Sequence, residues 1–366
     1  MSLHLSRLTL SHFRSHKRAV IEVDARPVAL FGPNGAGKTN LLEAVSLFSP
    51  GRGMRRASAE EMTRRPEAIG WKITGDLVSG GQRHEIAFQS ENGAARQVRI
   101  DDKAATQTQL GQIARVLWLV PAMDRLWIEG ADGRRRFLDR MTLSFFPAHA
   151  EVTLAYDKAM RERNRLLKDQ VRDGSWYRAL EGQMAEAGTL IHAHRLAALE
   201  ALDKAQTGAV TAFPAAALAL THPETEMPAT AEALCAALAD SRTQDLYAGR
   251  TLVGPHRADL EAVYTAKGVP ARDCSTGEQK ALLISLILAN ARALADQIGA
   301  PPILLLDEVA AHLDPSRRAA LYDEIVTLGA QAWMTGTERS LFEHLGPRAQ
   351  YREVTATEGT SQITVA

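Results

Sequence analysis

Residues 28–48 read VALFGPNGAGKTNLLEAVSLF, and this stretch decides the fold. A short apolar run precedes GPNGAGKT, which matches the pattern G-x-x-x-x-G-K-[ST] at every position, and a helical pattern follows it. Strand, glycine-rich loop and helix in this order predict a phosphate-binding loop. The expected nucleotide-binding residues are the eight positions of the match: Gly32, Pro33, Asn34, Gly35, Ala36, Gly37, Lys38 and Thr39.

The residue types in this loop suit three tasks in phosphate binding. Glycines let backbone N–H groups curl around phosphate oxygens. Lys38 supplies a positive charge to the β- and γ-phosphates, and the Thr39 hydroxyl can ligate Mg²⁺. The N-terminus of the following helix adds a favourable dipole. The alternative is a chance glycine-rich turn, which the flanking strand and helix disfavour.

A second apolar run, PPILLLDEV at 301–309, ends in two carboxylates. A buried strand delivers them to the sheet edge where ligands of open α/β sheets bind. There Asp307 would hold Mg²⁺, and Glu308 would polarise the attacking water in γ-phosphate hydrolysis. Alone, this run would be an ordinary strand end. Together with the phosphate loop it makes Glu308 and Lys38 the candidate catalytic residues.

The segment STGEQKALLISLILA begins at Ser275 and discriminates most between protein classes. Ser275 and Glu278 have the spacing of a capping box, which predicts a helix start. Gly277 permits close approach of another backbone. The alternative is a well-capped core helix, and the apolar content of this segment predicts core packing in either case.

The composition is that of an ordinary globular protein. A length of 366 residues predicts roughly two or three domains. Lys and Arg (43) balance Asp and Glu (43), so binding to nucleic acid requires a local basic cluster. Two cysteines exclude a disulfide scaffold. The longest apolar stretch, 281–289, is about half of a membrane span, and the N-terminus has no signal core. We expect a cytoplasmic protein without membrane contact.

The order of the patterns along the chain predicts an interrupted α/β fold. Strand-like runs occur within 3–31, 71–100 and 115–120 and return after 250, whereas 137–207 is helical in pattern. Residues 211–230 read as a Pro/Ala-rich connection and 230–249 as a further helix. The expected domains are an N-terminal ATPase half (1–121), a helical arm (122–250) and a C-terminal ATPase half (251–366).

Four motifs together resemble those of ATP-binding-cassette (ABC) ATPases: GPNGAGKT, STGEQ, LLLDEV and the HLD at 312–314. Lys38 and Asp307 are 269 residues apart with a helical insertion between them, an arrangement similar to the SMC-like DNA-repair branch. Within that branch the chain resembles the RecF family along essentially its whole length. This likeness is carried by LTLSHFRSHKRAVIEV, GRRRFLD, TLVGPHRADL and CSTGEQKALLISLILANA.

The resemblance implies an ABC-type core, a mixed sheet with flanking helices, that uses ATP and Mg²⁺. Two chains would sandwich two nucleotides, and a signature segment from each would reach the γ-phosphate on its partner: Ser275, Thr276, Gly277, Glu278 and Gln279. Asp314 matches the D-loop aspartate. The resemblance further implies a weak, DNA-stimulated ATPase whose closed dimer clamps DNA. Its implied partners are RecR and RecO, at duplex DNA and single-strand/duplex junctions, with RecA loading in repair of gaps and stalled forks as the outcome.

Two arginine clusters are candidates for binding DNA phosphates. The first follows the phosphate-loop helix and the second lies at the entry to the helical region; they comprise Arg52, Arg55, Arg56, Arg64, Arg65 and then Arg134, Arg135, Arg136. A solvated surface is an equally good explanation for such charge runs, and part of the second cluster could pack structurally.

Four further residues are less clear. Arg14, in SHFRSH, resembles the arginine of an N-terminal Phe-Arg pair in the family and is a candidate for nucleotide contact, with a strand-end cation as an equally good alternative. Asp124 stands where a glutamine would be expected in transporter cassettes. His256 and Arg257 belong to a family motif, GPHRADL, and their chemistry suggests no role.

Three rival functions remain open. An SMC-type chromosome organiser needs long heptad arms, which are missing from the sequence. A transporter cassette would lack the helical insertion and need a membrane partner. A protein-interaction module with a vestigial nucleotide site would retain DNA binding after loss of Lys38.

Overall fold

The computed structural model describes residues 2–65, 67–91, 93–223 and 226–366. Contacts between residues divide the chain into two compact units. Unit 1 comprises 1–125, 204–215 and 274–366, and unit 2 comprises 126–203 and 216–273. The proposed domain boundaries at 121 and 250 differ from this division, because β10 (Asp259–Tyr264) pairs with β9 (Ala216–Thr221) inside unit 2.

The first sheet of unit 1 is antiparallel and has the strand order β2-β1-β4-β5-β6-β7. Burial alternates along β1 as expected for a half-buried strand: the side chains of Leu8 and Leu10 are buried, whereas Arg7 is exposed. The register shifts between Leu5 and Arg7, which explains why the apolar period skips there. The strands span β1 His4–Phe13, β2 His16–Glu22, β4 Trp71–Ser79, β5 Gln82–Ser90, β6 Gln97–Ile100 and β7 Lys103–Ala105.

The second sheet of unit 1 is mixed, with the order β15-β14-β3-β13-β12-β8. Neighbours are parallel from β8 to β14, and only β15 is antiparallel. The strands β3, β8 and β12 are buried at every residue, as expected for parallel strands covered on both faces. The strands span β3 Val28–Phe31, β8 Val116–Leu119, β12 Ile303–Leu306, β13 Ala332–Gly336, β14 Gln350–Thr357 and β15 Thr360–Val365.

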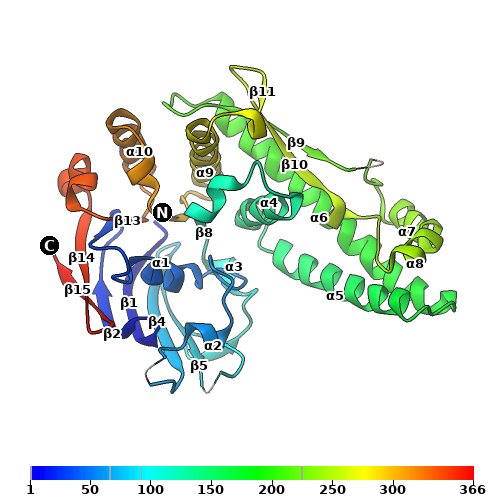
Figure 1. The fold of residues 1–366 in the computed structure, drawn as a ribbon, viewed down its shortest axis with the longest axis horizontal. Helices are drawn as coiled ribbons and strands as arrows, with labels where there is room; N and C mark the ends of the chain where they lie inside the picture. The colour runs from blue at the N-terminus through cyan, green and yellow to red at the C-terminus, as the bar shows by residue number, and fades with distance from the viewer. Residues whose placement is uncertain (1, 66, 92, 224–225) are drawn as a thin grey trace. The chain divides into compact units, whose positions relative to one another are not determined.

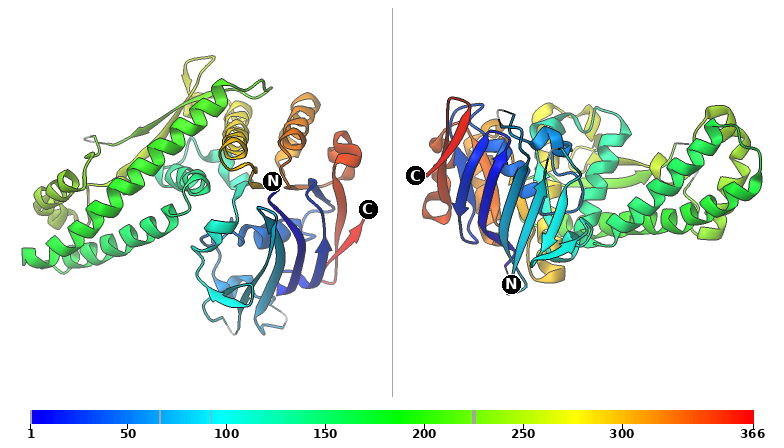
Figure 2. Two further views of the ribbon diagram at one scale, coloured as in Figure 1. Left: turned by 180° about the vertical axis from the view of Figure 1, so that it is seen from behind. Right: turned by 90° about the horizontal axis from the view of Figure 1, so that it is seen from below.

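Helices cover both faces of this mixed sheet (Figures 1 and 2). On one side, α1 (Lys38–Ser46) lies between the two sheets and buries Leu41, Leu42 and Val45. On the other side are α9 (Thr276–Ile298) and α10 (Pro315–Leu328), which contact each other. The expected mixed sheet with flanking helices is confirmed. Short elements complete unit 1: α2 Ala59–Met62, α3 Leu110–Ile113, η1 Pro121–Arg125, η4 Val309–His312 and η5 Arg339–Arg348.

Helix α9 is apolar enough to pass a test for membrane spans by length and composition. It is the one helix among the described residues that does so, and 67% of its most apolar window is buried inside the protein. A buried core helix passes the same test, so the result is weak evidence for a span.

Unit 2 combines helices with a small antiparallel sheet of order β11-β10-β9. Its elements are α4 Ala131–Phe145, α5 His149–Lys168, α6 Gly174–Thr207 up to residue 203, α7 Ala231–Asp240, α8 Arg242–Ala248, η2 Pro255–Arg257, β11 Val269–Pro270 and η3 Ala271–Asp273. Two local expectations were wrong. The segment 211–230, which we expected to be a connection, contains β9, because the side chains of ALALT can point alternately to the two faces of a sheet. Residues 224–225 of this segment lie outside the described range. The expected helix at 230–249 is two helices, α7 and α8.

A buried charge network holds the helices of unit 2 together. The Arg163 side chain is fully buried and pairs with Asp245 at 2.6 Å and with Glu181 at 3.2 Å. Arg163 also donates to the Leu238 carbonyl, and Arg242 pairs with Glu181. Every charge in the network has an opposite partner, which such burial requires.

Candidate nucleotide-binding site

The phosphate loop takes a backbone conformation that two of its glycines make possible. Gly32 has a φ of 144°, and a Cβ there would lie 2.0 Å from the Val354 carbonyl oxygen. Gly37 has a φ of 102°, and its Cβ would lie 2.3 Å from the Ser361 Oγ. L side chains rarely adopt such φ values, so both positions require glycine for space as well as for conformation.

Lys38 folds back over its own loop. Its Nζ donates to the carbonyls of Gly32 (2.6 Å) and Pro33 (2.9 Å), and the residue is 5% exposed. Burial lowers the pKa of Lys38, while the nearby carboxylates of Glu308 and Asp307 oppose that shift. The ammonium is therefore held inside the loop and close to both carboxylates that follow the second apolar run.

The structure brings together the two predicted magnesium ligands from opposite ends of the sequence. The Thr39 hydroxyl donates to Asp307 Oδ1 at 3.0 Å. Asp307 directly follows β12, and Thr39 lies at the start of α1, which follows β3 and the phosphate loop. Because β3, β13 and β12 are parallel neighbours, both side chains lie at the carboxyl edge of the sheet. A hydroxyl and a carboxylate side by side are oxygen ligands of the type that Mg²⁺ prefers.

The fit for Mg²⁺ depends on further oxygens from outside the protein. Over the part of the chain that the structure describes, no group of three or more His, Cys, Asp or Glu side chains could hold a metal ion. Mg²⁺ usually keeps several waters and binds through one or two protein ligands together with substrate phosphates. Thr39 and Asp307 fit that pattern.

Thr335 belongs to this site and was missed from the sequence. Its hydroxyl donates to Asp307 Oδ1 at 2.7 Å and accepts from the Glu308 backbone N–H at 2.8 Å. Thr335 lies near the end of β13, next to β12 in the sheet. A polar residue near the end of the apolar run QAWMTG was the signal that could have revealed it.

Glu308 occupies an unusual backbone conformation at the start of η4. Its φ is 54°, in the left-handed region, and it is half-buried. Non-glycine residues held in this region cluster at functional sites. Its role as the residue that orients water stays a prediction.

Arg14 lies close to the phosphate-loop helix but has a partner of its own. Its guanidinium makes two bonds to the fully buried carboxylate of Glu43, at 2.6 and 2.9 Å, and Arg55 reaches the same carboxylate at 3.3 Å. Glu43 stands one helical turn after Thr39, and sequence reasoning overlooked it. Nucleotide contact by Arg14 stays a prediction, since this pair alone accounts for its position.

The signature segment begins α9 as the capping box predicts. Ser275 Oγ accepts from the Glu278 N–H, and a Glu278 carboxylate oxygen accepts from the Ser275 N–H at 2.9 Å. Ser275, Thr276 and Gly277 are exposed, Glu278 is half-buried and Gln279 is buried. A Cβ at Gly277 would meet no described atom within 4 Å. Nothing within the described chain therefore explains a glycine here.

Asp314 and Asp124 both have structural partners. Asp314 caps α10, where its side chain accepts from the Arg317 N–H at 2.9 Å. Asp124, on η1, pairs with Lys280 on α9 at 3.2 Å. Asp124 thus ties the segment after β8 to the signature helix, an arrangement that the sequence did not suggest.

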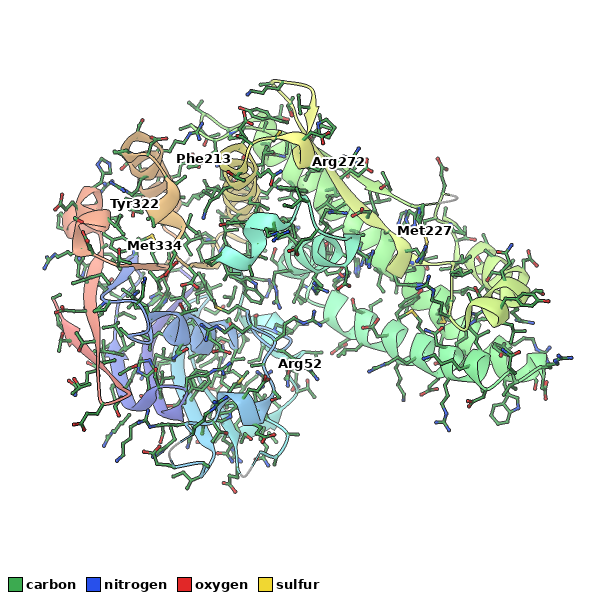
Figure 3. The ribbon with its side chains drawn as sticks, in the orientation of Figure 1. Arg52, Phe213, Met227, Arg272, Tyr322 and Met334 are labelled. Carbon is green, nitrogen blue, oxygen red and sulfur yellow. The ribbon has the colours of Figure 1, made fainter. Side chains whose placement is uncertain are left out.

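The arginine clusters separate into exposed and engaged residues. Arg52 (Figure 3), Arg55, Arg56 and Arg65 are exposed. Arg64 is buried and donates to the carbonyls of Ser15 and Gly359.

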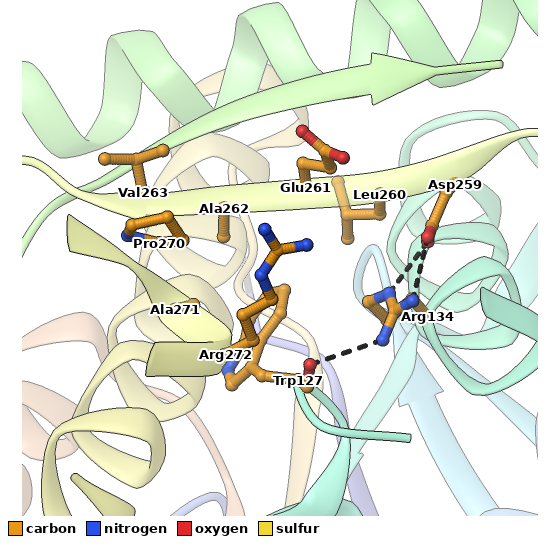
Figure 4. A pocket seen from close by; sticks show the side chains of 10 residues that line it. All are labelled: Trp127, Arg134, Asp259, Leu260, Glu261, Ala262, Val263, Pro270, Ala271 and Arg272. Atoms are coloured by element: carbon orange, nitrogen blue, oxygen red, sulfur yellow. Dashed lines mark hydrogen bonds and ion pairs between the residues drawn. The ribbon is translucent and has the colours of Figure 1, made fainter. Parts of the chain in front are cut away.

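The second cluster is mostly engaged within unit 2. Arg134 forms a two-pronged pair with Asp259 at 2.7 and 2.8 Å, in the wall of a cavity of about 110 Å³ (Figure 4). This cavity is far smaller than the several hundred Å³ of a typical ligand site. Arg135 donates to the Ala258 carbonyl, and only Arg136 is exposed, where it pairs with Asp132.

His256 has a structural explanation. Tyr156 Oη lies 2.7 Å from one ring nitrogen, and the Thr251 carbonyl lies 3.0 Å from the other. Burial lowers the pKa of His256 to about 4. Gly254 fits beside it because a Cβ would lie 2.3 Å from Tyr156 Oη. Arg257, next along the chain, is half-buried and no described contact gives it a function.

Known proteins match this chain over nearly its full length. Residues 4–362 match the family described as RecF/RecN/SMC N terminal domain. The DNA replication and repair protein RecF of Rhizobium rhizogenes is 47% identical over 95% of this chain and 96% of its own. That of Caulobacter vibrioides is 46% identical over 95% of each chain.

Solved structures agree on the fold. A structure described as the recombination mediator protein RecF-ATP in the RecFOR pathway has a TM-score of 0.84 at 24% identity, covering 100% of this chain and 98% of its own. An Smc head domain from Pyrococcus furiosus has a TM-score of 0.59 at 16% identity, covering 100% and 96%. Together with the sequence matches, these findings show that the chain belongs to the RecF family, within the wider RecF/RecN/SMC group.

Proposed function

We propose that this protein is an ATP-dependent, DNA-binding recombination mediator that dimerises on ATP and acts in DNA repair and replication. One observation carries the proposal: Thr39 and Asp307, 268 residues apart, share a hydrogen bond of 3.0 Å beside a desolvated Lys38. These are the groups that a Mg²⁺-nucleotide needs. The relatives' name, DNA replication and repair protein RecF, supports the biological setting.

The exposed signature segment supports a site completed by a second chain. Ser275, Thr276 and Gly277 are exposed at the N-terminus of α9, and no described atom approaches Gly277. The N-terminus of a helix favours anions. In the proposed dimer, each chain holds one nucleotide in its own phosphate loop and offers Ser275–Gln279 to the γ-phosphate on its partner, with Asp314 nearby as the D-loop residue.

Hydrolysis in this proposal is slow and resets the dimer. Lys38 neutralises phosphate charge, and Mg²⁺ held by Thr39 and Asp307 would add charge stabilisation as phosphoryl transfer requires. Glu308 orients the attacking water, and the Thr335 hydroxyl fixes the Asp307 carboxylate and the Glu308 backbone. ATP binds the closed dimer and shifts the population towards it.

The exposed arginines near α1 are the proposed duplex contacts. Arg52, Arg56 and Arg65 are exposed, and Arg55 shares its charge with Glu43. Arg136, which belongs to unit 2, is a separate and weaker candidate because Asp132 already pairs with it. We leave Arg64, Arg134 and Arg135 out of the proposed contacts, since their guanidinium groups serve the chain's own carbonyls and Asp259.

RecR and RecO are the proposed partners, with single-strand/duplex junctions as DNA targets and RecA loading as the outcome. Support comes from family membership and from the pathway to which similar solved structures are assigned, the RecFOR pathway.

Sedimentation velocity with and without ATP tests the proposal directly. The native chain should dimerise on ATP, whereas Lys38→Met should stay monomeric because it cannot bind the nucleotide. Ser275→Arg should bind ATP as a monomer and fail to dimerise. Ser58→Arg is a matched control, because Ser58 and Glu61 form a second exposed capping box on α2. A Ser275→Arg variant that dimerises like the control would contradict the two-chain site.

The same preparations discriminate the rival functions. Duplex DNA should stimulate hydrolysis, and Glu308→Gln should bind ATP and remain a dimer. A transporter cassette would instead respond to a membrane partner. Retention of native DNA binding by Lys38→Met, with or without ATP, would favour an interaction module with a vestigial nucleotide site.

A further inference from the structure

The exposed aromatic side chains of this protein gather at one end of unit 2. The chain has five Trp, six Tyr and nine Phe residues, all of which the structure describes, and Trp176 and Tyr247 are the two that are exposed. Their exposed fractions are 65% and 90%. Trp176 lies in the first turn of α6 and Tyr247 in the last turn of α8. Since only 5% of the chain is aromatic, the gathering of both exposed rings at one end calls for an explanation.

Contacts tie the two segments together at this end. Gln170, in the turn between α5 and α6, donates from Nε2 to the carbonyl of Leu246 at 3.2 Å. Arg242, the first residue of α8, lies against the first turn of α6, where its guanidinium stacks on Tyr177 at 5.8 Å. Arg163 stacks on the same ring, also at 5.8 Å. The exposed Trp176 is therefore followed by a buried tyrosine that two arginines of the charge network contact.

The same end carries an excess of positive charge. The charges that are buried or half-buried, Arg163 and Arg242 against Glu181 and Asp245, cancel one another. The exposed cations of segments 161–178 and 241–250 are Arg161, Arg165, Lys168, Arg172, Arg178 and Arg250. Four exposed carboxylates oppose them: Glu162, Asp169, Asp173 and also Asp240, which directly precedes the second segment. This end of unit 2 therefore carries an excess of about two positive charges, on a chain whose net charge is zero.

We propose that this end of unit 2, the aromatic end, binds single-stranded DNA by stacking bases on Trp176 and Tyr247 while the surrounding cations contact phosphates. Exposed aromatic faces beside an excess of cations are the combination that single strands require. Duplex DNA keeps its bases stacked inside and would leave both rings unused. A protein partner could cover the rings, but the positive excess favours a polyanion. The inference rests on the proposed DNA-binding function and assigns the single-stranded part of the target to this surface.

Fluorescence anisotropy of labelled oligo(dT) with the full-length protein tests the proposal. Trp176→Ala and Tyr247→Ala should each weaken binding about fivefold to a hundredfold, the effect of losing one stacked base. Trp176→Phe should recover most of the loss, since it restores a ring without the indole. Leu190→Ala is the matched control, because Leu190 lies on the same helix and is 49% exposed. Arg172→Ala with Arg178→Ala should flatten the salt dependence, by about 0.7 in logarithmic slope for each phosphate that the protein no longer neutralises.

Tryptophan emission offers an independent readout. The other four tryptophans, Trp71, Trp118, Trp127 and Trp333, are at most 7% exposed. Acrylamide should therefore quench Trp176 selectively, and bound oligo(dT) should protect it. Unchanged quenching, together with native oligo(dT) affinity in the Trp176→Ala/Tyr247→Ala variant, would overturn the inference and leave this surface to a protein partner. If the native protein binds no DNA of any kind, the proposed function itself fails.

Discussion

Gly277→Ala separates two properties: the stability of the single chain and the affinity with which two chains associate. Gly277 is the second residue of α9 after the Ser275 cap, and its φ is not in the left-handed region. A Cβ would meet no described atom within 4 Å. Alanine is favoured over glycine in a helix by about 0.5–1 kcal/mol. The isolated chain should therefore be stabilised, with a rise in Tm of about 1–3 °C.

The proposed dimer reverses the sign of this effect. If a second chain brings its nucleotide against the N-terminus of α9, the added methyl group occupies the space that glycine leaves open. A loss of about 1.4 kcal/mol in association corresponds to a tenfold weaker dimer. Gly37→Ala behaves differently, because its φ of 102° and a Cβ 2.3 Å from Ser361 Oγ conflict within the chain itself. That variant should be destabilised by roughly 1–2 kcal/mol from its backbone conformation alone.

Calorimetry without nucleotide and sedimentation velocity with ATP measure the two effects on one preparation. We expect Gly277→Ala to melt later than the native chain and to associate about ten times more weakly. Gly37→Ala should melt earlier. A Gly277→Ala variant that dimerises with native affinity would refute the reasoning, since no second chain would then approach this position.

Three other predictions follow from single contacts. Arg163→Leu should lower the free energy of unfolding by about 3–5 kcal/mol, because the buried carboxylate of Asp245 loses its cation. Urea unfolding measures this loss, and the exposed Arg161→Leu is the control. Thr335→Val should lower ATP turnover about tenfold or more with nearly native ATP affinity, since it frees Asp307 and the Glu308 N–H. Burial lowers the pKa of His256 to about 4, so the unfolded chain, with a pKa of about 6.5, takes up a proton that the native state refuses. Stability should then fall as pH drops from about 6.5 towards 4, and His256→Gln should show a smaller fall in urea midpoint over that range.

The sequence was sufficient for those parts of the fold that a local pattern encodes. The phosphate loop between β3 and α1, and the capping box at Ser275, are local because their residues lie within a few positions of one another. The sequence also predicted that Thr39 and Asp307 lie in one site, because the carboxyl ends of parallel strands meet at one edge of the sheet. Strand β9 was missed because its run is short, rich in alanine and flanked by prolines.

Contacts between distant segments could not be predicted from patterns in the sequence. Ser361 reaches the phosphate loop from β15, where its Oγ donates to the Ala36 carbonyl at 2.6 Å. No spacing rule links positions so far apart. Arg64 and Arg134 read as surface cations, because a pattern of charges does not reveal which of them has a carbonyl or carboxylate partner in the fold. Burial, and not residue type, decided which arginines stay candidates for DNA binding.

The capping box that begins α9 bears on how a second chain could use it. A single Glu278 carboxylate oxygen accepts from both the N–H and the hydroxyl of Ser275, at 2.9 and 2.8 Å. In the proposed dimer, an incoming phosphate would seek the Ser275 hydroxyl together with the first backbone N–H groups of the helix. The Glu278 carboxylate thus competes with phosphate for Ser275 and repels it by charge. In the proposed dimer, a nucleotide already held by the partner's phosphate loop would arrive at a high local concentration and could displace Glu278 from Ser275. We therefore expect weak association without ATP, because no phosphate is then present to replace Glu278 at Ser275.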